Sequence, residues 1–340
     1  MTRLKYLLLI AIIACVSSCK NKQNNFYAIK DFRKPVQPFL HVVASKGMVT
    51  YYDSSQISII TDAELVRLGK SENPILRATA YSQMLKRKSF NKLDVILNHL
   101  DDTSMVAIDE GEFGMAFRRV SDFILLEANW ERFDAKDRVV DRLITKHNYL
   151  STAYTMLPQL NPQERYYSYI KDMAIRPRHT DPYQGYELGF GDIEYALYGL
   201  AKFRKGQDVP VIRHTLLKHV GDLSDVSFRL MKEFPDTAYL DVLQIYHTRF
   251  FYRFSGVRPH GFTGVAADRA APEDFINALV AQKSEQSAIM LDTMLHRLAG
   301  FTCMPDRDNI MRAVVAAIRE NPCSAYVRLR KKSELKPGKF

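Results

Sequence analysis

The sequence predicts a mainly α-helical protein, an irregular α-solenoid of helical hairpins with one small β-hairpin near the N-terminus. Three observations favour this fold. Apolar residues recur with helical spacing from Thr61 onward, helix start signals precede several of these segments, and one segment is repeated. The repeated segment reads NPILRATAY at residues 73–81 and VPVIRHTLL at residues 209–217.

The N-terminal residues have the parts of an export signal. Arg3 and Lys5 precede an apolar run over residues 7–16, and small residues follow it. Such a run is too short to span a hydrocarbon core of ~30 Å, which takes about 20 apolar residues. We therefore expect residues 1–18 to be a signal peptide.

The end of this segment, Val16-Ser17-Ser18-Cys19, resembles the lipobox of bacterial lipoproteins. The resemblance implies that Cys19 is lipidated and begins the mature chain. Two or three acyl chains give stable membrane anchoring. The residue after Cys19 is Lys20 and not an aspartate. By resemblance to known sorting signals, this implies that the anchor lies in the outer membrane and that the protein faces the periplasm. The alternative is an ordinary cleavable signal with a chance cysteine.

The composition indicates a globular, basic protein, and the signal and lipobox resemblance imply the cell envelope as its compartment. The 340 residues are 46% hydrophobic and carry a net charge of +10, which suits anionic lipid headgroups or acidic partners. Nucleic acid is not an expected partner in this compartment. Cys303 and Cys323 would meet an oxidising environment, so they form either a disulfide or two buried thiols.

The expected organisation after the signal is a tether followed by one domain. Residues 19–38 are polar with two prolines and predict a flexible tether. Residues 40–44 and 48–52 are β-prone and flank Ser45-Lys46-Gly47, which predicts a hairpin. Residues 39–340 are expected to form a single α-helical repeat domain.

The expected helices begin with clear capping signals. Thr61 and Glu64 form a capping box, and Asn73 stands before Pro74 at a second helix start. A third helix starts near residue 90. Further helices are expected at roughly 113–128, 135–147, 151–158, 162–174 and 192–204, from Asp208 onward, around 228–231 and at 309–318.

The repeated segments resemble the short HEAT-like repeats named after phycobilisome lyases. The matching residues are Pro74, Arg77, Ala78, Ala80 and Asp102 in one unit, Pro210, Arg213 and Asp236 in the next, and Arg312 in a partial third. The resemblance implies stacked hairpins. We expect the three arginines to bond an aspartate or the terminal carbonyls of the neighbouring unit. The alternative is a row of ligand-binding arginines.

Two long loops are the candidate binding surfaces, over residues 176–192 and 255–272. Long loops rich in Arg, Tyr and Phe have the composition of protein interfaces. The candidate residues are Arg176, Arg178, His179, Asp181, Tyr183, Tyr186, Phe190, Arg258, His260 and Phe262. The alternative is a pair of irregular linkers. If the chain has a catalytic centre, His179, Asp181 and His260 are its expected location.

No metal, cofactor or catalytic motif is predicted. The histidines lack metal-ligand spacing, and HExxH, paired CxxC, GxSxG and phosphate-loop patterns do not occur. The acidic residues Asp101, Asp102, Asp109, Glu110 and Glu112 are expected to cap helices rather than bind calcium.

Three functions fit these features. The first is a lipid-anchored scaffold that binds another envelope protein. The second is an envelope enzyme that acts on peptidoglycan or glycan with residues of the two loops, and the third is an immunity-type lipoprotein that neutralises a toxin. Fold analogy alone does not choose among them.

Overall fold

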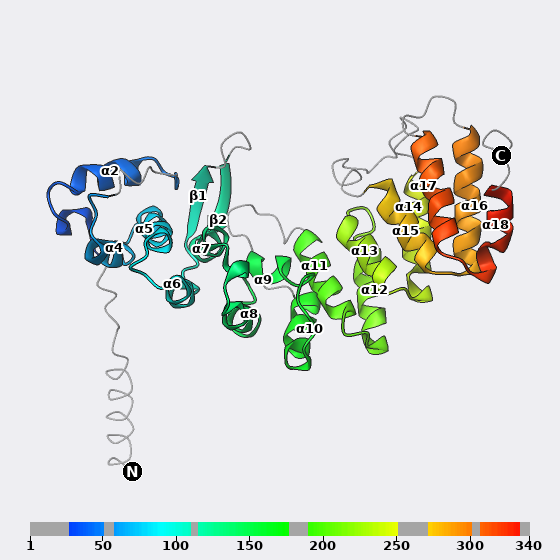
Figure 1. The fold of residues 1–340 in the computed structure, drawn as a ribbon, viewed down its shortest axis with the longest axis horizontal. Helices are drawn as coiled ribbons and strands as arrows, with labels where there is room; N and C mark the ends of the chain where they lie inside the picture. The colour runs from blue at the N-terminus through cyan, green and yellow to red at the C-terminus, as the bar shows by residue number, and fades with distance from the viewer. Residues whose placement is uncertain are drawn as a thin grey trace, which may run out of the picture. The chain divides into compact units, whose positions relative to one another are not determined.

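The structure, a computed structural model, describes residues 27–50, 58–109, 115–176, 190–250, 271–300 and 307–333. Within these ranges the chain is mainly helical, with sixteen α-helices and one two-stranded antiparallel sheet (Figure 1). The chain divides into two compact units, Met1–Val139 and Val140–Phe340, where the sequence predicted a single domain.

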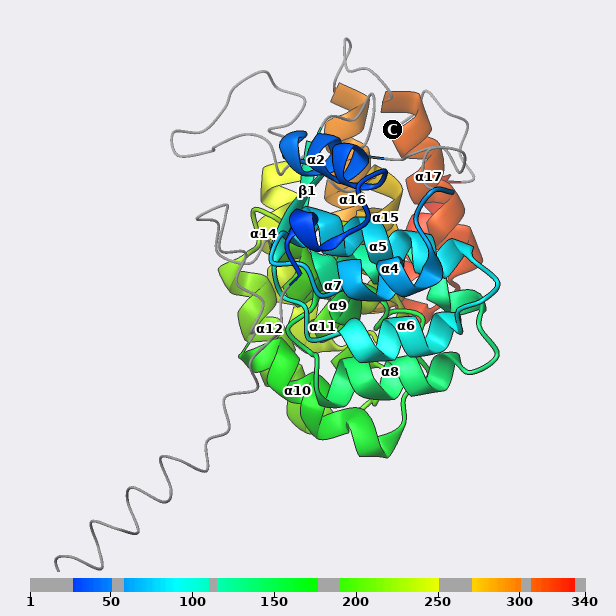
Figure 2. The same cartoon turned by 90° about the vertical axis from the view of Figure 1, so that its left-hand side faces the viewer.

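The first unit is built around α5. Its elements are η1 (Ile29–Asp31), α2 (Gln37–Ser45), α4 (Asp62–Leu68), α5 (Pro74–Lys86), α6 (Lys92–His99), β1 (Met105–Asp109), β2 (Met115–Arg119), α7 (Val120–Ala128) and η3 (Trp130–Arg132), and α8 (Lys136–Thr145) crosses into the second unit. Helix α5 packs against α2, α4, α6, α7 and β1, and Figure 2 shows it beside α4. Nine of its thirteen residues are buried, so α5 is the core of this unit.

The predicted helix starts of this unit are confirmed. The Thr61 hydroxyl accepts a hydrogen bond from the Glu64 backbone N–H at 3.3 Å, and the Glu64 carboxylate accepts one from the Thr61 N–H at 2.9 Å. The Asn73 side chain accepts from the Ile75 N–H at 2.9 Å, before Pro74 at the first helical position. These bonds satisfy amides that have no partner within a helix.

The predicted N-terminal β-hairpin is wrong. Residues 37–45 form α2, because Val36, Leu40 and Val43 recur at helical spacing and are fully buried on one face. Val49 forms only an isolated bridge with Ile108. The sheet lies later in the chain.

That sheet replaces the start of a predicted helix. Strands β1 and β2 are antiparallel, with Met105 opposite Arg119 and Asp109 opposite Met115. The helix expected at 113–128 therefore begins at Val120, as α7.

The stretch expected to be a flexible tether is packed from residue 27 onward. Phe32 and Val36 are buried, and the Arg33 guanidinium pairs with the Glu64 carboxylate at 2.8 Å. A tether over the whole of residues 19–38 is therefore wrong. The part before residue 27 lies outside the described residues.

The second unit consists of successive helical pairs. Its elements are α9 (Ser151–Thr155), η4 (Glu164–Tyr166), α10 (Tyr167–Ile175), α11 (Phe190–Ala201), η5 (Gly206–Asp208), α12 (Val209–Lys218), α13 (Asp225–Glu233), η6 (Thr237–Tyr239), α14 (Leu240–Phe250), α15 (Pro272–Ala281), α16 (Glu285–Gly300), α17 (Arg307–Glu320), η9 (Ser324–Tyr326) and α18 (Val327–Ser333). Helices α9, α11, α13, α15 and α17 pack against one another in that order, and α14 packs between α12 and α16. Each helix thus covers its apolar face on the pairs next to it in sequence.

Three of these pairs share a turn that the repeat analysis missed. Each turn is a 3₁₀ helix that ends in a fully buried tyrosine, with a proline four residues earlier. The pairs are Pro162 and Tyr166, Pro235 and Tyr239, and Pro322 and Tyr326. The Tyr326 hydroxyl donates to the Val280 carbonyl at 2.9 Å, and burial raises the pKa of Tyr326 to about 12. The shared P-x-x-x-Y spacing was readable in the sequence.

Close packing at Gly69 gives a prediction. A Cβ atom there would lie 2.8 Å from the Tyr81 ring, whose hydroxyl bonds the Gly69 carbonyl and whose face stacks on His99. We expect Gly69→Ala to lower the free energy of unfolding by about 1–3 kcal/mol in urea titration, because the ring cannot move aside without losing these contacts. Gly206→Ala is the matched control, since nothing lies within 4 Å of its Cβ position. Equal stability of the two variants would contradict the packing.

Candidate functional site

The two loops predicted to bind a partner lie almost entirely outside the described residues. Arg176 follows α10 and is 80% exposed, and it pairs with Asp172 on its own helix at 3.1 Å. Phe190 is the first residue of α11. The other eight candidates lie outside the described residues: Arg178, His179, Asp181, Tyr183, Tyr186, Arg258, His260 and Phe262. The loops therefore stay a prediction.

The predicted cysteine sites also fall largely outside this part of the chain. Cys19 and Cys303 are not among the described residues. Cys323 precedes η9 and is partly exposed. Lipidation of Cys19 and pairing of Cys303 with Cys323 stay predictions.

Arg77 has the structural contacts expected of the repeat arginine. Its guanidinium donates to the Asp102 carboxylate at 2.7 and 3.0 Å, to the Ser71 carbonyl at 2.7 Å and to the Ser104 hydroxyl at 2.6 Å. Both charged side chains are nearly buried. The bonds join the start of α5 to the segment after α6, within one hairpin rather than between neighbouring units. Asp102 also accepts from the Ser104 N–H, so it braces the entry to β1 rather than capping a helix.

The other two arginines do not repeat this arrangement. Arg213 pairs with Asp241, while Asp236 instead accepts from the Ala238 N–H at 2.9 Å and caps η6. Arg312 bonds Asn309 and the Asp308 carbonyl on its own helix. The expected arginine–aspartate pairing is therefore found for Arg77, with Asp102, and for Arg213, with Asp241, but not for Arg312.

A buried carboxylate fastens α11 to α13. Glu194 of α11 accepts from the Ser224 N–H at 2.8 Å, from the Ser224 hydroxyl at 2.7 Å and from the Ser227 hydroxyl. Burial raises the pKa of Glu194, while these bonds lower it. The group is 1% exposed, so it serves the packing of the two helices rather than a site open to ligands.

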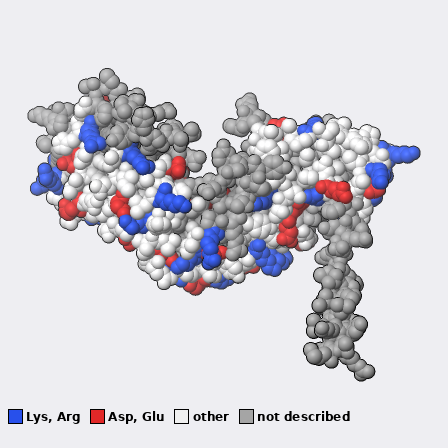
Figure 3. Space-filling model, turned by 180° about the vertical axis from the view of Figure 1, so that it is seen from behind, with Lys and Arg blue, Asp and Glu red and all other residues white. Residues whose placement is uncertain are grey.

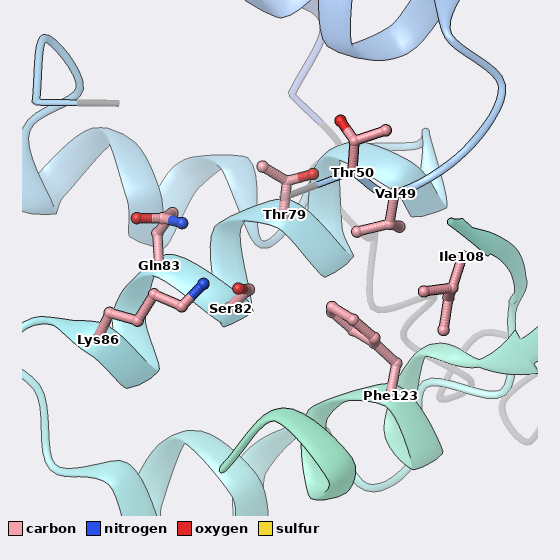
Figure 4. A pocket seen from close by; sticks show the side chains of 8 residues that line it. All are labelled: Val49, Thr50, Thr79, Ser82, Gln83, Lys86, Ile108 and Phe123. Carbon is pink, nitrogen blue, oxygen red and sulfur yellow. The ribbon is translucent and has the colours of Figure 1, made fainter. Parts of the chain in front are cut away.

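A small pocket lies in the first unit, beside α5 (Figure 4). Its polar wall consists of Thr50, Thr79, Ser82, Gln83 and Lys86, and its apolar wall of Val49, Ile108 and Phe123. The pocket measures about 290 Å³ including its open mouth.

The polar groups of this pocket are partly satisfied. Ser82 and Lys86 both contact the Glu127 carboxylate, at 3.1 and 2.8 Å. Gln83 is 7% exposed, and its amide has no hydrogen bond to a described residue. Little of this volume is enclosed, so the space next to the Gln83 amide suits an ordered water better than a substrate.

Helices α14 and α16 expose two isoleucines among uncharged polar side chains, which makes them a candidate surface for a protein partner. It consists of Gln244, Ile245, Thr248, Gln286, Ile289 and Thr293, which we call the isoleucine face. Ile245 is 39% and Ile289 66% exposed. The Gln286 amide donates to the Gln244 amide oxygen at 2.9 Å and joins the two helices.

The threonines extend the apolar character of the isoleucine face. The Thr248 hydroxyl donates to the Gln244 carbonyl at 3.0 Å, and the Thr293 hydroxyl donates to the Ile289 carbonyl at 2.8 Å. Because both hydroxyls donate to carbonyls of their own helix, the threonine methyl groups are the part of these side chains available to contact a partner.

Charge does not mark a broad site on the face of the described residues that Figure 3 draws. Figure 3 shows Lys and Arg interspersed with Asp and Glu over the face in view. The described residues contain no group of three potential metal ligands. No helix among them is long and apolar enough to cross a membrane.

Comparisons with known proteins found no match among protein families, curated proteins or solved structures.

The arginine contacts give a prediction with a matched pair of variants. We expect Arg77→Gln to lower the free energy of unfolding by roughly 3 kcal/mol, because it leaves the Asp102 charge nearly buried and unpaired. Arg312→Gln should change it by less than about 0.5 kcal/mol, since that exposed arginine bonds only its own helix. Urea unfolding of both variants checks this. Similar losses in the two would contradict the assigned roles.

Glu194 gives a pH-dependent prediction. Its pKa is raised in the folded state, so its contribution to stability is full below the unfolded pKa near 4.5 and is lost as pH rises through the folded value. Glu194→Gln keeps the hydrogen-bonding shape without the charge. The stability of this variant relative to the original protein should therefore increase from pH 4 to pH 7, as measured by urea unfolding.

Glu194→Leu is the control for this experiment. It leaves the Ser224 N–H and two hydroxyls without their acceptor and should cost about 1–3 kcal/mol at both pH values. A pH-independent difference between Glu194→Gln and the original protein would contradict the burial of a titrating carboxylate.

Proposed function

We propose that the protein is a lipid-anchored scaffold of the cell envelope that binds another envelope protein through the isoleucine face. The observation that carries the proposal is that Ile245 and Ile289 are exposed on two helices that the uncharged Gln244 and Gln286 side chains join. Cores of protein interfaces are depleted in charge and enriched in apolar contacts.

The repeated helical pairs support a scaffold role. We infer that the pairs of the second unit follow one another as an irregular α-solenoid, because α9, α11, α13, α15 and α17 each contact the next in sequence order. Solenoids bury their core between neighbouring repeats and leave long helix faces free for partners. The isoleucine face is one such helix face.

The edges of the isoleucine face suit a polypeptide partner. On one side, the Arg213–Asp241 pair bonds α12 to α14, and on the other His296 lies 3.9 Å from Asp292. An apolar centre with a polar rim is the usual anatomy of a protein interface. The expected partner presents apolar side chains to the isoleucines and amide groups to Gln244 and Gln286.

The lipid anchor of this proposal comes from the sequence. The charged start, the short apolar run and the lipobox-like end at Cys19 together favour lipidation. On this basis we propose an outer-membrane protein that faces the periplasm.

Affinity purification from the native envelope tests the proposal with three variants. Ile289→Asp places a charge in the isoleucine face, and Leu126→Asp is the matched control, because Leu126 is 59% exposed on α7 of the first unit. Cys19→Ala removes the proposed anchor. Mass spectrometry should find one near-stoichiometric partner with the original protein and with Leu126→Asp.

The same partner should fall at least tenfold with Ile289→Asp and be lost with Cys19→Ala, which should also leave the membrane fraction. Circular dichroism would establish that all variants are folded. A partner held equally by Ile289→Asp, or a Cys19→Ala protein still in the membrane fraction, would overturn the corresponding half of the proposal.

A further inference from the structure

Three cations gather on two aromatic rings at the ends of α11 and α13. The Tyr198 and Phe234 rings pack edge to face, with their centroids 5.8 Å apart. The Arg229 guanidinium lies 4.6 Å and the Lys202 ammonium 5.9 Å from the Tyr198 centroid, and the Arg204 guanidinium lies 5.1 Å from the Phe234 centroid. All five residues belong to the second unit.

These cations are not balanced by acidic partners. Among the described residues, Glu233 is the one carboxylate within ion-pair distance of any of the three, at 3.6 Å from Arg229. The Tyr198 hydroxyl already donates to this carboxylate. Lys202 instead donates to the uncharged Pro158 carbonyl at 2.7 Å, and the Arg204 guanidinium has no hydrogen bond to a described residue. The cluster keeps two positive charges in excess.

The surroundings make this excess costly. Burial lowers the pKa of Lys202, the Glu233 charge raises it, and the Arg229 charge lowers it. Lys202 and Arg229 are therefore close enough for their charges to repel each other. Arg204 also adopts a left-handed backbone with φ of 53°, which is uncommon for a residue with a side chain. A cation held at such a backbone, without an acidic partner, is an arrangement that an added anion would stabilise.

We propose that Lys202, Arg204 and Arg229 form a binding site for a phosphate monoester. A phosphate monoester carries a charge of about −1.5 to −2 at neutral pH, which matches the excess charge of the cluster. Two guanidinium groups can each give parallel hydrogen bonds to phosphate oxygens, and the lysine adds a point charge. The contacts with the Tyr198 and Phe234 rings hold the three cations on one aromatic pair.

The alternative is that the cations only cover the rings as packing. Cation–ring contacts at exposed sites contribute about 0.5–1 kcal/mol each without any ligand. The two accounts differ in one measurable property, because packing alone gives no saturable anion binding. The proposal is independent of the isoleucine face, which lies on α14 and α16.

Isothermal titration of the full protein in detergent with glycerol phosphate tests the site. Lys202→Gln/Arg204→Gln removes two of the cations, and Lys218→Gln/Arg328→Gln is the matched control, because it removes the same charges at exposed positions of the same unit. We expect saturable binding that weakens at least tenfold in the first double variant and changes less than twofold in the control. Thermal unfolding in the absence of ligand would establish that both variants are folded.

Mixed micelles separate the two sources of such a phosphate. Binding to micelles that contain phosphatidic acid, but not to phosphatidylcholine micelles or free glycerol phosphate, would support the site and identify a lipid headgroup as the ligand. Binding to glycerol phosphate as well would support the site for the phosphate group itself. No saturable binding to either probe, or equal weakening in both double variants, would overturn the proposal.

Discussion

The fold depends on the burial of one apolar face per helix against the neighbouring helices. Helix α5 buries most of its length among α2, α4, α6, α7 and β1, and in the second unit each first helix of a pair lies against the next. No single pair could bury both of its apolar faces alone. Side chains that this packing leaves exposed are available for binding, whereas the side chains buried by it are not.

Polar groups within the packed regions fix how the helices meet. Arg77 joins the start of α5 to the segment after α6, and Glu194 joins α11 to the first turn of α13. The buried tyrosines hold the turns within three helical pairs. Because each of these groups is satisfied by its neighbours, none is free to act on a ligand. The isoleucine face and the cation cluster around Tyr198 differ, since Ile245 and Ile289 are exposed and the three cations share one carboxylate, Glu233.

The sequence predicted the helical class and many helix starts, because local capping bonds decide where a helix begins. It failed at residues 40–45, where β-branched residues were weighed above the helical spacing of Val36, Leu40 and Val43. It also failed at residues 115–119, which form strand β2 before α7. It predicted that Arg213 bonds an aspartate or the terminal carbonyls of a neighbouring unit, and tertiary packing brings Asp241 to that arginine. The isoleucine face is recognised from the exposed fractions of Ile245 and Ile289 in the structure. Helical periodicity in a single sequence identifies the buried faces of helices and does not identify an exposed isoleucine.

A direct test of the central claim is crosslinking in the native envelope with a photoreactive amino acid at position 289 and, as a control, at position 126. The account predicts one dominant adduct to a single envelope protein from position 289 and none of that adduct from position 126. An absence of adducts at position 289, or the same adducts at both positions, would contradict the account.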